Sequence, residues 1–174
     1  YRKAVADGTA KERIVFLSLH ADSRHPSLGG LMVYVPGSAY RAGTYGHNSK
    51  SYRKFKEVRE KPFVRFSKKN RVDSEAVSRR LAESIVESYR AQALAIQPYK
   101  PIRNRIIRGR SVYVPAVLRW NEIPTKLLVE VVNLNNPEDA KLLARARERQ
   151  RMADALLAGI FAHFGEDEPE RPST

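Results

Sequence analysis

One acidic side chain, Glu130, lies inside an apolar run, where a carboxyl group is unfavourable unless it has a structural or functional role. Residues 127–132 read Leu-Leu-Val-Glu-Val-Val, and this lack of alternation predicts a strand that is covered on both faces. Burying an ionised carboxylate there costs several kcal/mol unless the group is paired or bound to a metal. The sequence therefore predicts a strand that delivers one acid. The alternative is a surface strand on which Glu130 faces water.

A histidine, His20, follows a second apolar run. Five of the six residues from 14 to 19 are apolar, which predicts a buried central strand with His20 at its carboxyl end. Ligands of open α/β sheets bind at the carboxyl ends of the strands. His20 is therefore a candidate metal ligand, and the alternative is a packed or hydrogen-bonded histidine.

Composition limits what these two residues can belong to. The chain has 174 residues, of which 42% are hydrophobic and 29% charged, as expected for one globular domain. The 32 Lys and Arg residues exceed the 19 Asp and Glu residues by 13, which favours an anionic partner such as nucleic acid, an acidic membrane or an anionic wall polymer. The chain has no cysteine, so a zinc site would need His, Asp or Glu ligands.

Further features of the sequence bear on membrane association, on the start of the chain and on nucleic-acid binding. No apolar run approaches the roughly 20 residues of a membrane span, so we expect no transmembrane segment. The chain starts at Tyr1 without an initiator Met or a signal peptide, and we expect it to begin within a longer protein. Basic runs are not interleaved with aromatic residues and match no groove-reading motif, so nucleic acid is not expected as a partner.

The elements that must position the two residues can be predicted in outline. After Gly29-Gly30, residues 31–35 predict a third short strand, and residues 111–114 predict a short edge strand that residues 117–120 continue. A helix capped at Asp73 should place four apolar side chains on one face, namely Val77, Leu81, Ile85 and Tyr89.

Two more helices should follow the strand that carries Glu130. Asn136 and Pro137 have the residue types of a helix cap and first turn, with acidic residues after them. An apolar stripe from Met152 to Phe164 predicts a last helix, which Gly165 closes.

Residues 38–72 form a long basic segment without a convincing apolar period, in which only residues 51–60 suggest a helix. The simplest interpretation is a solvated basic loop. The alternative is a lid or a polyanion-binding arm.

Taken together, the motifs resemble a known family. Residues 16–22, Phe-Leu-Ser-Leu-His-Ala-Asp, are followed by 128–140, Leu-Val-Glu-Val-Val-Asn-Leu-Asn-Asn-Pro-Glu-Asp-Ala, and by 150–160, Gln-Arg-Met-Ala-Asp-Ala-Leu-Leu-Ala-Gly-Ile. In this order they resemble the zinc-dependent N-acetylmuramoyl-L-alanine amidases of bacterial peptidoglycan. Arg108-Gly109-Arg110 and Val117-Leu118-Arg119 also stand where that family has similar residues.

The resemblance implies a hydrolase that cuts the amide between N-acetylmuramic acid and L-alanine, with zinc held by His, Glu and His. His20 matches the second histidine ligand and Glu130 matches the catalytic Glu. The other ligands are expected upstream of Tyr1, and no ligand role falls on His25, His47 or His163. The chain alone is therefore expected to be incomplete for activity. The apolar residues around Glu130 should hold its pKa up, which suits a general base.

We therefore expect an α/β fold in which helices flank a mixed central sheet (α/β/α). Residues 1–165 should form the amidase-like catalytic domain without its N-terminal part, with a basic insert at about 38–72 and a polar tail at 166–174. Glu57 or Glu60 would be regulatory if the insert covers the metal. The resemblance also implies peptidoglycan as the partner, a regulatory activator protein and a periplasmic or secreted location. The alternative function is a non-catalytic amidase-like or polyanion-binding module.

Overall fold

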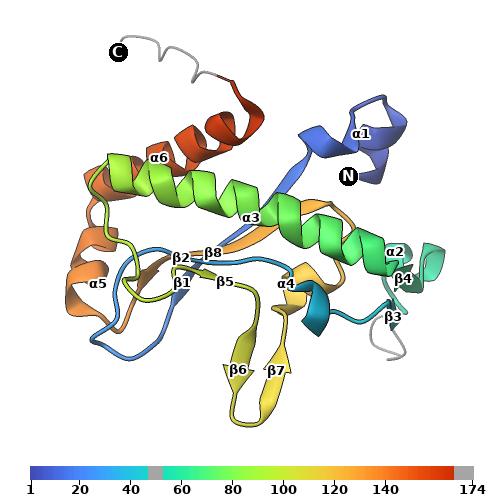
Figure 1. Ribbon diagram of the computed structural model, residues 1–174, viewed down its shortest axis with the longest axis horizontal. Helices are drawn as coiled ribbons and strands as arrows, with labels where there is room; N and C mark the ends of the chain where they lie inside the picture. The colour runs from blue at the N-terminus through green and yellow to red at the C-terminus, as the bar shows by residue number, and fades with distance from the viewer. Residues whose placement is uncertain (47–52, 167–174) are drawn as a thin grey trace.

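The structure, a computed structural model that describes residues 1–46 and 53–166, is built around a four-stranded sheet with the order β1–β8–β2–β5 (Figure 1). Strand β8 runs parallel to β1 and antiparallel to β2, and β2 runs parallel to β5. The sheet is therefore mixed, as predicted. Its strands are β1 (Val15–Asp22), β2 (Met32–Tyr34), β5 (Ile102–Arg103) and β8 (Thr125–Asn133).

Helices cover the two faces of this sheet unequally. The long helices α3 (Lys68–Ala91) and α6 (Ala146–Phe164) lie side by side over one face (Figure 1). The other face carries the one-turn helix α4 (Ala116–Arg119) and a hairpin of β6 (Ile106–Arg108) and β7 (Ser111–Tyr113). None of the helices in the described residues is long and apolar enough to cross a membrane.

The alternation of side chains along β8 divides the core into two clusters. Leu127 and Val129 point toward α3 and α6, where they pack with buried residues that include Leu81, Ile85 and Tyr89 of α3 and Met152 and Leu156 of α6. Leu128 points to the opposite face and packs with Met32, Tyr34, Val114 and Leu118. Residues 127–129 are at most 7% exposed, so the predicted double coverage of this strand is confirmed.

Strand β1 differs from the prediction, because it is an edge strand and not a central one. Within the described residues it pairs only with β8, and its side chains are half-buried or exposed. Leu19 is 57% exposed. Apolar composition indicates that a strand packs on a sheet, but it does not show whether a neighbour lies on each side.

The start of α3 was predicted too late in the chain. The helix begins at Lys68, and its cap is Ser67, whose Oγ accepts a hydrogen bond from the Asn70 backbone N–H at 3.0 Å. Asn70 Oδ1 accepts in return from the Ser67 backbone N–H at 3.3 Å, which completes a capping box. Asp73 lies within the helix and pairs with Lys69 instead of capping it.

The prediction that residues 117–120 extend a strand was also wrong. Pro115 caps a short helix there, and β7 pairs with β6 outside the main sheet.

The helices after β8 agree with the prediction from the sequence. Asn136 caps α5 (Pro137–Ala144) by accepting from the Glu138 and Asp139 backbone N–H groups. Helix α6 ends at Gly165, whose φ is 68°.

The basic segment contains more structure than predicted. It holds the 3-10 turn η2 (Ser38–Tyr40), a hairpin of β3 (Thr44–Gly46) and β4 (Phe63–Arg65), and the short helix α2 (Lys56–Glu60). Residues 47–52 lie outside the described part, as do residues 167–174 of the predicted polar tail. The chain before β1 forms α1 (Arg2–Ala6) and the 3-10 turn η1 (Lys11–Arg13).

Buried Arg41 joins the basic segment to the residues just before β8, and buried Lys126 at the start of the strand contacts the same residues. Arg41, 3% exposed, donates to the Arg119 and Asn121 carbonyl oxygens at 2.9 and 2.7 Å, and its guanidinium lies 3.7 Å from the centre of the Phe66 ring. Lys126, 1% exposed, also donates to the Asn121 carbonyl at 2.9 Å. Burial, together with the charge of Arg41, lowers the pKa of Lys126 to about 6.

The contact between α3 and α6 depends on Gly159, because a Cβ at that position would lie 2.6 Å from Ile85 Cα. Helix propensity alone favours Ala over Gly by about 1 kcal/mol. We expect steric overlap to outweigh that gain, so that Gly159→Ala lowers the free energy of unfolding by roughly 1–3 kcal/mol in urea denaturation. Ala153→Gly, at an exposed position of the same helix, calibrates the propensity effect. A Gly159→Ala variant more stable than the parent would contradict the close packing.

Candidate active site

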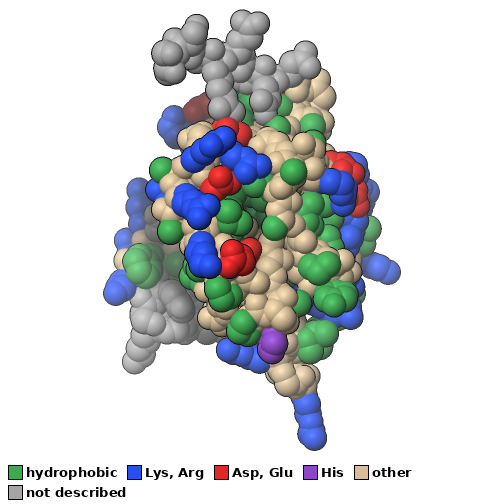
Figure 2. Space-filling view, turned by 90° about the vertical axis from the view of Figure 1, so that its left-hand side faces the viewer, with side chains coloured by type: hydrophobic (Ala, Val, Ile, Leu, Met, Phe, Trp, Pro, Cys, Tyr) green, Lys and Arg blue, Asp and Glu red, His purple; other side chains and the backbone are tan. Residues whose placement is uncertain are grey.

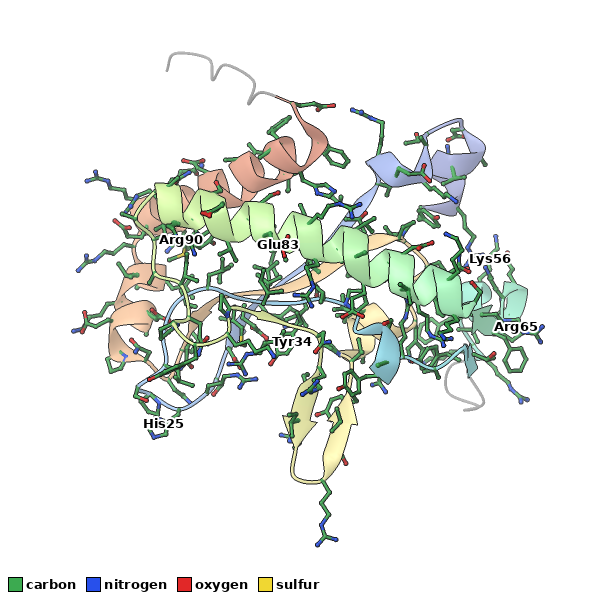
Figure 3. All side chains as sticks on the ribbon, in the orientation of Figure 1. His25, Tyr34, Lys56, Arg65, Glu83 and Arg90 are labelled. Carbon is green, nitrogen blue, oxygen red and sulfur yellow. The ribbon has the colours of Figure 1, made fainter. Side chains whose placement is uncertain are left out.

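His20 and Glu130 are directly opposite each other on the paired strands β1 and β8. Neighbouring strands lie about 4.8 Å apart, and partners in a parallel pair point to the same side of the sheet. This side also carries Leu128, Met32 and Tyr34. Figure 3 shows Tyr34 on the side of the sheet away from α3. The two predicted site residues therefore share the face that the long helices leave open.

Glu130 is half-buried, and its environment favours the neutral acid. Its Oε2 atom is buried and has no hydrogen-bond partner among the described residues. Burial and, second to it, the nearby charge of Asp22 raise the pKa of Glu130 to about 7, against the opposing effect of Arg24. A carboxyl group with a pKa near 7 can accept and release a proton at neutral pH, as general acid–base catalysis requires.

Asp22, Arg24 and Tyr34 form a polar network beside Glu130. The Arg24 Nε donates to Asp22 Oδ2, and its Nη2 donates to Tyr34 Oη. Asp22, Arg24 and Glu130 line the same small recess. This network was not predicted from the sequence, in which the only local signal is the polar stretch Asp22-Ser23-Arg24 after an apolar strand.

Asn133 and Asp139 hold the loop after β1 against the end of β8. The Asn133 Nδ2 donates to the His25 and Leu28 carbonyl oxygens at 3.0 and 2.6 Å, and its Oδ1 accepts from the Arg24 backbone N–H at 2.9 Å. The buried Asp139 Oδ2 accepts from the backbone N–H groups of Gly30 and Asn133, both at 2.8 Å. These bonds fix where Arg24 leaves the strand and thus where its guanidinium lies.

The three histidines in the described part of the chain do not assemble a metal centre on their own. His20 is exposed, and its Nε2 lies 2.8 Å from Ser18 Oγ. His25 contacts Ser27 in the loop after β1, and His163 lies against Phe164 at the end of α6, while His47 is outside the described part. Residues 1–46 and 53–166 contain no group of three His, Asp or Glu side chains that could hold a metal ion. They offer one imidazole beside a carboxyl group, which is less than a closed zinc site needs.

The structure does not bring Glu60 to Glu130. Glu60 pairs with Lys56 at 3.7 Å, and Lys61, directly after α2, pairs with Glu122 just before β8 begins. Helix α2 therefore lies near the opposite end of β8 from Glu130 (Figure 1). The Glu57 side chain is outside the described part, and a regulatory role for either residue stays a prediction.

Comparison with known proteins connects this geometry to one family. Residues 2–162 match the family model described as N-acetylmuramoyl-L-alanine amidase. The N-acetylmuramoyl-L-alanine amidase AmiA of Escherichia coli (strain K12) is 24% identical over 157 residues. That match covers 86% of this chain and 52% of AmiA, so the chain spans about half the length of the curated relative it matches.

Solved structures show the same fold. The N-acetylmuramyl-L-alanine amidase Ami1 of Mycobacterium smegmatis matches with a TM-score of 0.56 and 21% identity, covering 87% of this chain and 54% of Ami1. The CwlD amidase of Clostridioides difficile, solved in complex with the GerS lipoprotein, matches with a TM-score of 0.55 and 16% identity, covering 94% of this chain and 59% of CwlD. The predicted amidase-like fold is confirmed.

The raised pKa of Glu130 predicts a pH-dependent effect of Glu130→Gln on stability. Near pH 4 the carboxyl group is largely protonated in both the folded and the unfolded chain. Between pH 4.5 and about 7 it ionises only in the unfolded chain, so the parent loses stability as the pH rises. By pH 8 the folded parent holds a partly desolvated carboxylate. After allowance for solvent screening, we expect Glu130→Gln to be more stable than the parent by about 1–2 kcal/mol at pH 8.

Urea unfolding of both proteins at pH 4 and pH 8 measures this difference. Glu83→Gln removes an exposed carboxylate of α3 and serves as the matched control. A stability difference between Glu130→Gln and the parent that is the same at both pH values would contradict the raised pKa.

Proposed function

Because the chain belongs to the N-acetylmuramoyl-L-alanine amidase family, we propose that it hydrolyses the amide bond between N-acetylmuramic acid and L-alanine in peptidoglycan. The observation that carries this proposal is the pairing of His20 with Glu130 on the open face of the sheet. There the carboxyl group has a pKa of about 7. Peptidoglycan is the proposed partner, and the periplasm or the outside of the cell is the proposed location.

Glu130 acts as the proton carrier in this proposal. Its ionised form takes a proton from the water that attacks the scissile carbonyl carbon, and the resulting acid gives the proton to the leaving nitrogen. Because the pKa lies near 7, both forms are accessible at neutral pH. The positive charge of Arg24 favours the ionised form between turnovers, and its bonds to Asp22 and Tyr34 keep it in place.

Zinc is the proposed cofactor of the intact protein, with His20 as one ligand. An exposed imidazole beside a carboxyl group fits that role, although the described residues do not complete a three-ligand site. Bound zinc polarises a carbonyl and lowers the pKa of its water. The edge of β1 that does not pair with β8 could receive a further strand, and donors carried by that strand would lie close to His20.

An activator protein is a further proposed partner. CwlD, which has the same fold, is solved in complex with a lipoprotein. For this chain, the role of such a partner would be to complete or uncover the site around His20.

The second candidate is a non-catalytic amidase-like or polyanion-binding module. The surplus of 13 positive charges and the lack of a three-donor cluster among the described residues favour it. On the face shown in Figure 2, however, basic side chains are interspersed with acidic ones. Such mixing suits a polyanion less well than a continuous basic stripe does.

The base assignment predicts a specific kinetic defect. In a form of the protein that digests peptidoglycan, Glu130→Gln keeps the shape of the side chain but removes the base. Turnover should fall by roughly 10²–10⁴-fold while the zinc content stays the same. Release of soluble fragments and metal analysis measure the two quantities, with Glu83→Gln as the control. Near-normal turnover would make Glu130 structural, and loss of zinc would make it a ligand.

His20 should behave differently from Glu130. We expect His20→Ala to lose zinc as well as turnover, because a ligand that contacts the metal is removed. Metal analysis after dialysis against a mild chelator tests this, with the exposed His25→Ala as the matched control. Full zinc content in His20→Ala would remove His20 from the ligand set.

A further inference from the structure

A groove with basic walls lies beside the candidate site on the open side of the sheet. Its lining residues are Arg24, Lys100, Arg103, Asn104, Arg105 and Ile107, here called the basic groove. Arg24 belongs both to this groove and to the recess that holds Glu130. We infer that the basic groove binds a free carboxylate of the stem peptide while the scissile amide lies at Glu130. This inference rests on the proposed function and deepens it.

Arg103 and Arg105 of the groove are held in place without being neutralised. Arg105 Nη1 donates to Tyr40 Oη at 2.5 Å, and the guanidinium lies 4.9 Å from the centre of that ring. Arg103 Nε donates to the Lys100 carbonyl oxygen at 3.1 Å. Across residues 1–46 and 53–166, no carboxylate lies within ion-pair distance of Lys100, Arg103 or Arg105.

Asp22 and Glu75 contact residues of the groove, and the charge of each is already engaged. Asp22 pairs with Arg24. Glu75 accepts from the Ser38 backbone N–H at 2.6 Å and from Asn104 Nδ2 at 3.1 Å, and it lies 3.7 Å from Arg79. The groove therefore keeps a net positive charge, which an anionic ligand would neutralise.

Strand register sets the distance between the groove and Glu130. Arg103 on β5 is opposite Tyr34 on β2, and Tyr34 is opposite Leu128 on β8, two residues before Glu130. Arg103 therefore lies on the same side of the sheet as Glu130, two strand spacings and one two-residue step away. The two strand spacings run across the sheet and the two-residue step runs along the strand, so these perpendicular displacements combine to a distance of roughly 12 Å between the backbones. An extended peptide covers about 3.5 Å per residue, so the bound carboxylate should lie about two to four residues from the scissile amide.

The groove suits a carboxylate on a peptide. The half-buried Arg103 and Arg105 offer planar guanidinium groups that can donate two parallel hydrogen bonds to one carboxylate. Lys100 adds an exposed charge, and the 63% exposed Ile107 offers apolar contact to the aliphatic part of a peptide. The basic groove would then distinguish substrates by the length and charge of the stem peptide, and not by the sugar.

Binding without turnover provides the test. The probes are an N-acetylmuramoyl tetrapeptide with free carboxylates and the same compound with those carboxylates amidated, titrated calorimetrically into the 174-residue chain with Glu130→Gln. We expect the free acid to bind more tightly, and Arg103→Gln to weaken its binding by about 10–100-fold while barely changing binding of the amidated probe. Arg90→Gln, which removes an exposed arginine at the far end of α3 (Figure 3), should change neither.

The outcomes separate this inference from the proposed function. The carboxylate site is overturned if Arg103→Gln weakens the binding of both probes equally. It is also overturned if the chain with Glu130→Gln alone does not detectably bind the free acid. Both results stand even where an active form hydrolyses peptidoglycan. Selective binding of the free acid that depends on Arg103, in a protein that does not cleave the amide, supports the groove and overturns only the amidase activity.

Discussion

The structure depends on one strand, β8, that is paired along both edges. Its parallel partner β1 brings His20 to Glu130, and its antiparallel partner β2 brings Met32 to the other side of the same residue. Alternation then assigns Leu127 and Val129 to the core under the long helices, and Leu128 and Glu130 to the open face. A shift of register by one residue would bury the Glu130 carboxyl group under α3 and expose the apolar core residues of β8. The same register therefore determines both the core packing and the position of the site residues.

Lys126 at the start of β8 and Glu130 near its other end differ in whether their buried polar atoms have hydrogen-bond partners. At its start, the buried Nζ of Lys126 donates to the backbone carbonyls of Asn121 and Ile123, which fixes the turn that leads into the strand. Near its other end, Glu130 keeps a buried oxygen without a hydrogen-bond partner among the described residues. A buried polar atom that is satisfied stabilises a particular arrangement, whereas an unsatisfied one marks a place where a ligand, water or proton can act. By this criterion Lys126 has a structural role and Glu130 a functional one.

The sequence predicted what depends on local pattern. The apolar run around Glu130, the cap at Asn136 and the stripe of α6 were all found because periodicity and capping residues are local signals. The start of α3 was missed because Asn70 takes the place that Glu or Gln usually has in a capping box. Asp22, Arg24 and Tyr34 were missed as a group because only the pairing of strands distant in sequence brings them together.

Helix α3 has 24 residues and is therefore about 36 Å long, yet its ends have different surroundings. Leu81, Ile85 and Tyr89 are buried in the core, whereas residues 68–70 are exposed and held by the Ser67 cap. The buried part of this helix is therefore expected to be locally more stable than its exposed first turn. Amide protons near residues 81–89 should exchange with solvent only when the whole domain unfolds, whereas those of the first turns should exchange through fraying of the helix end.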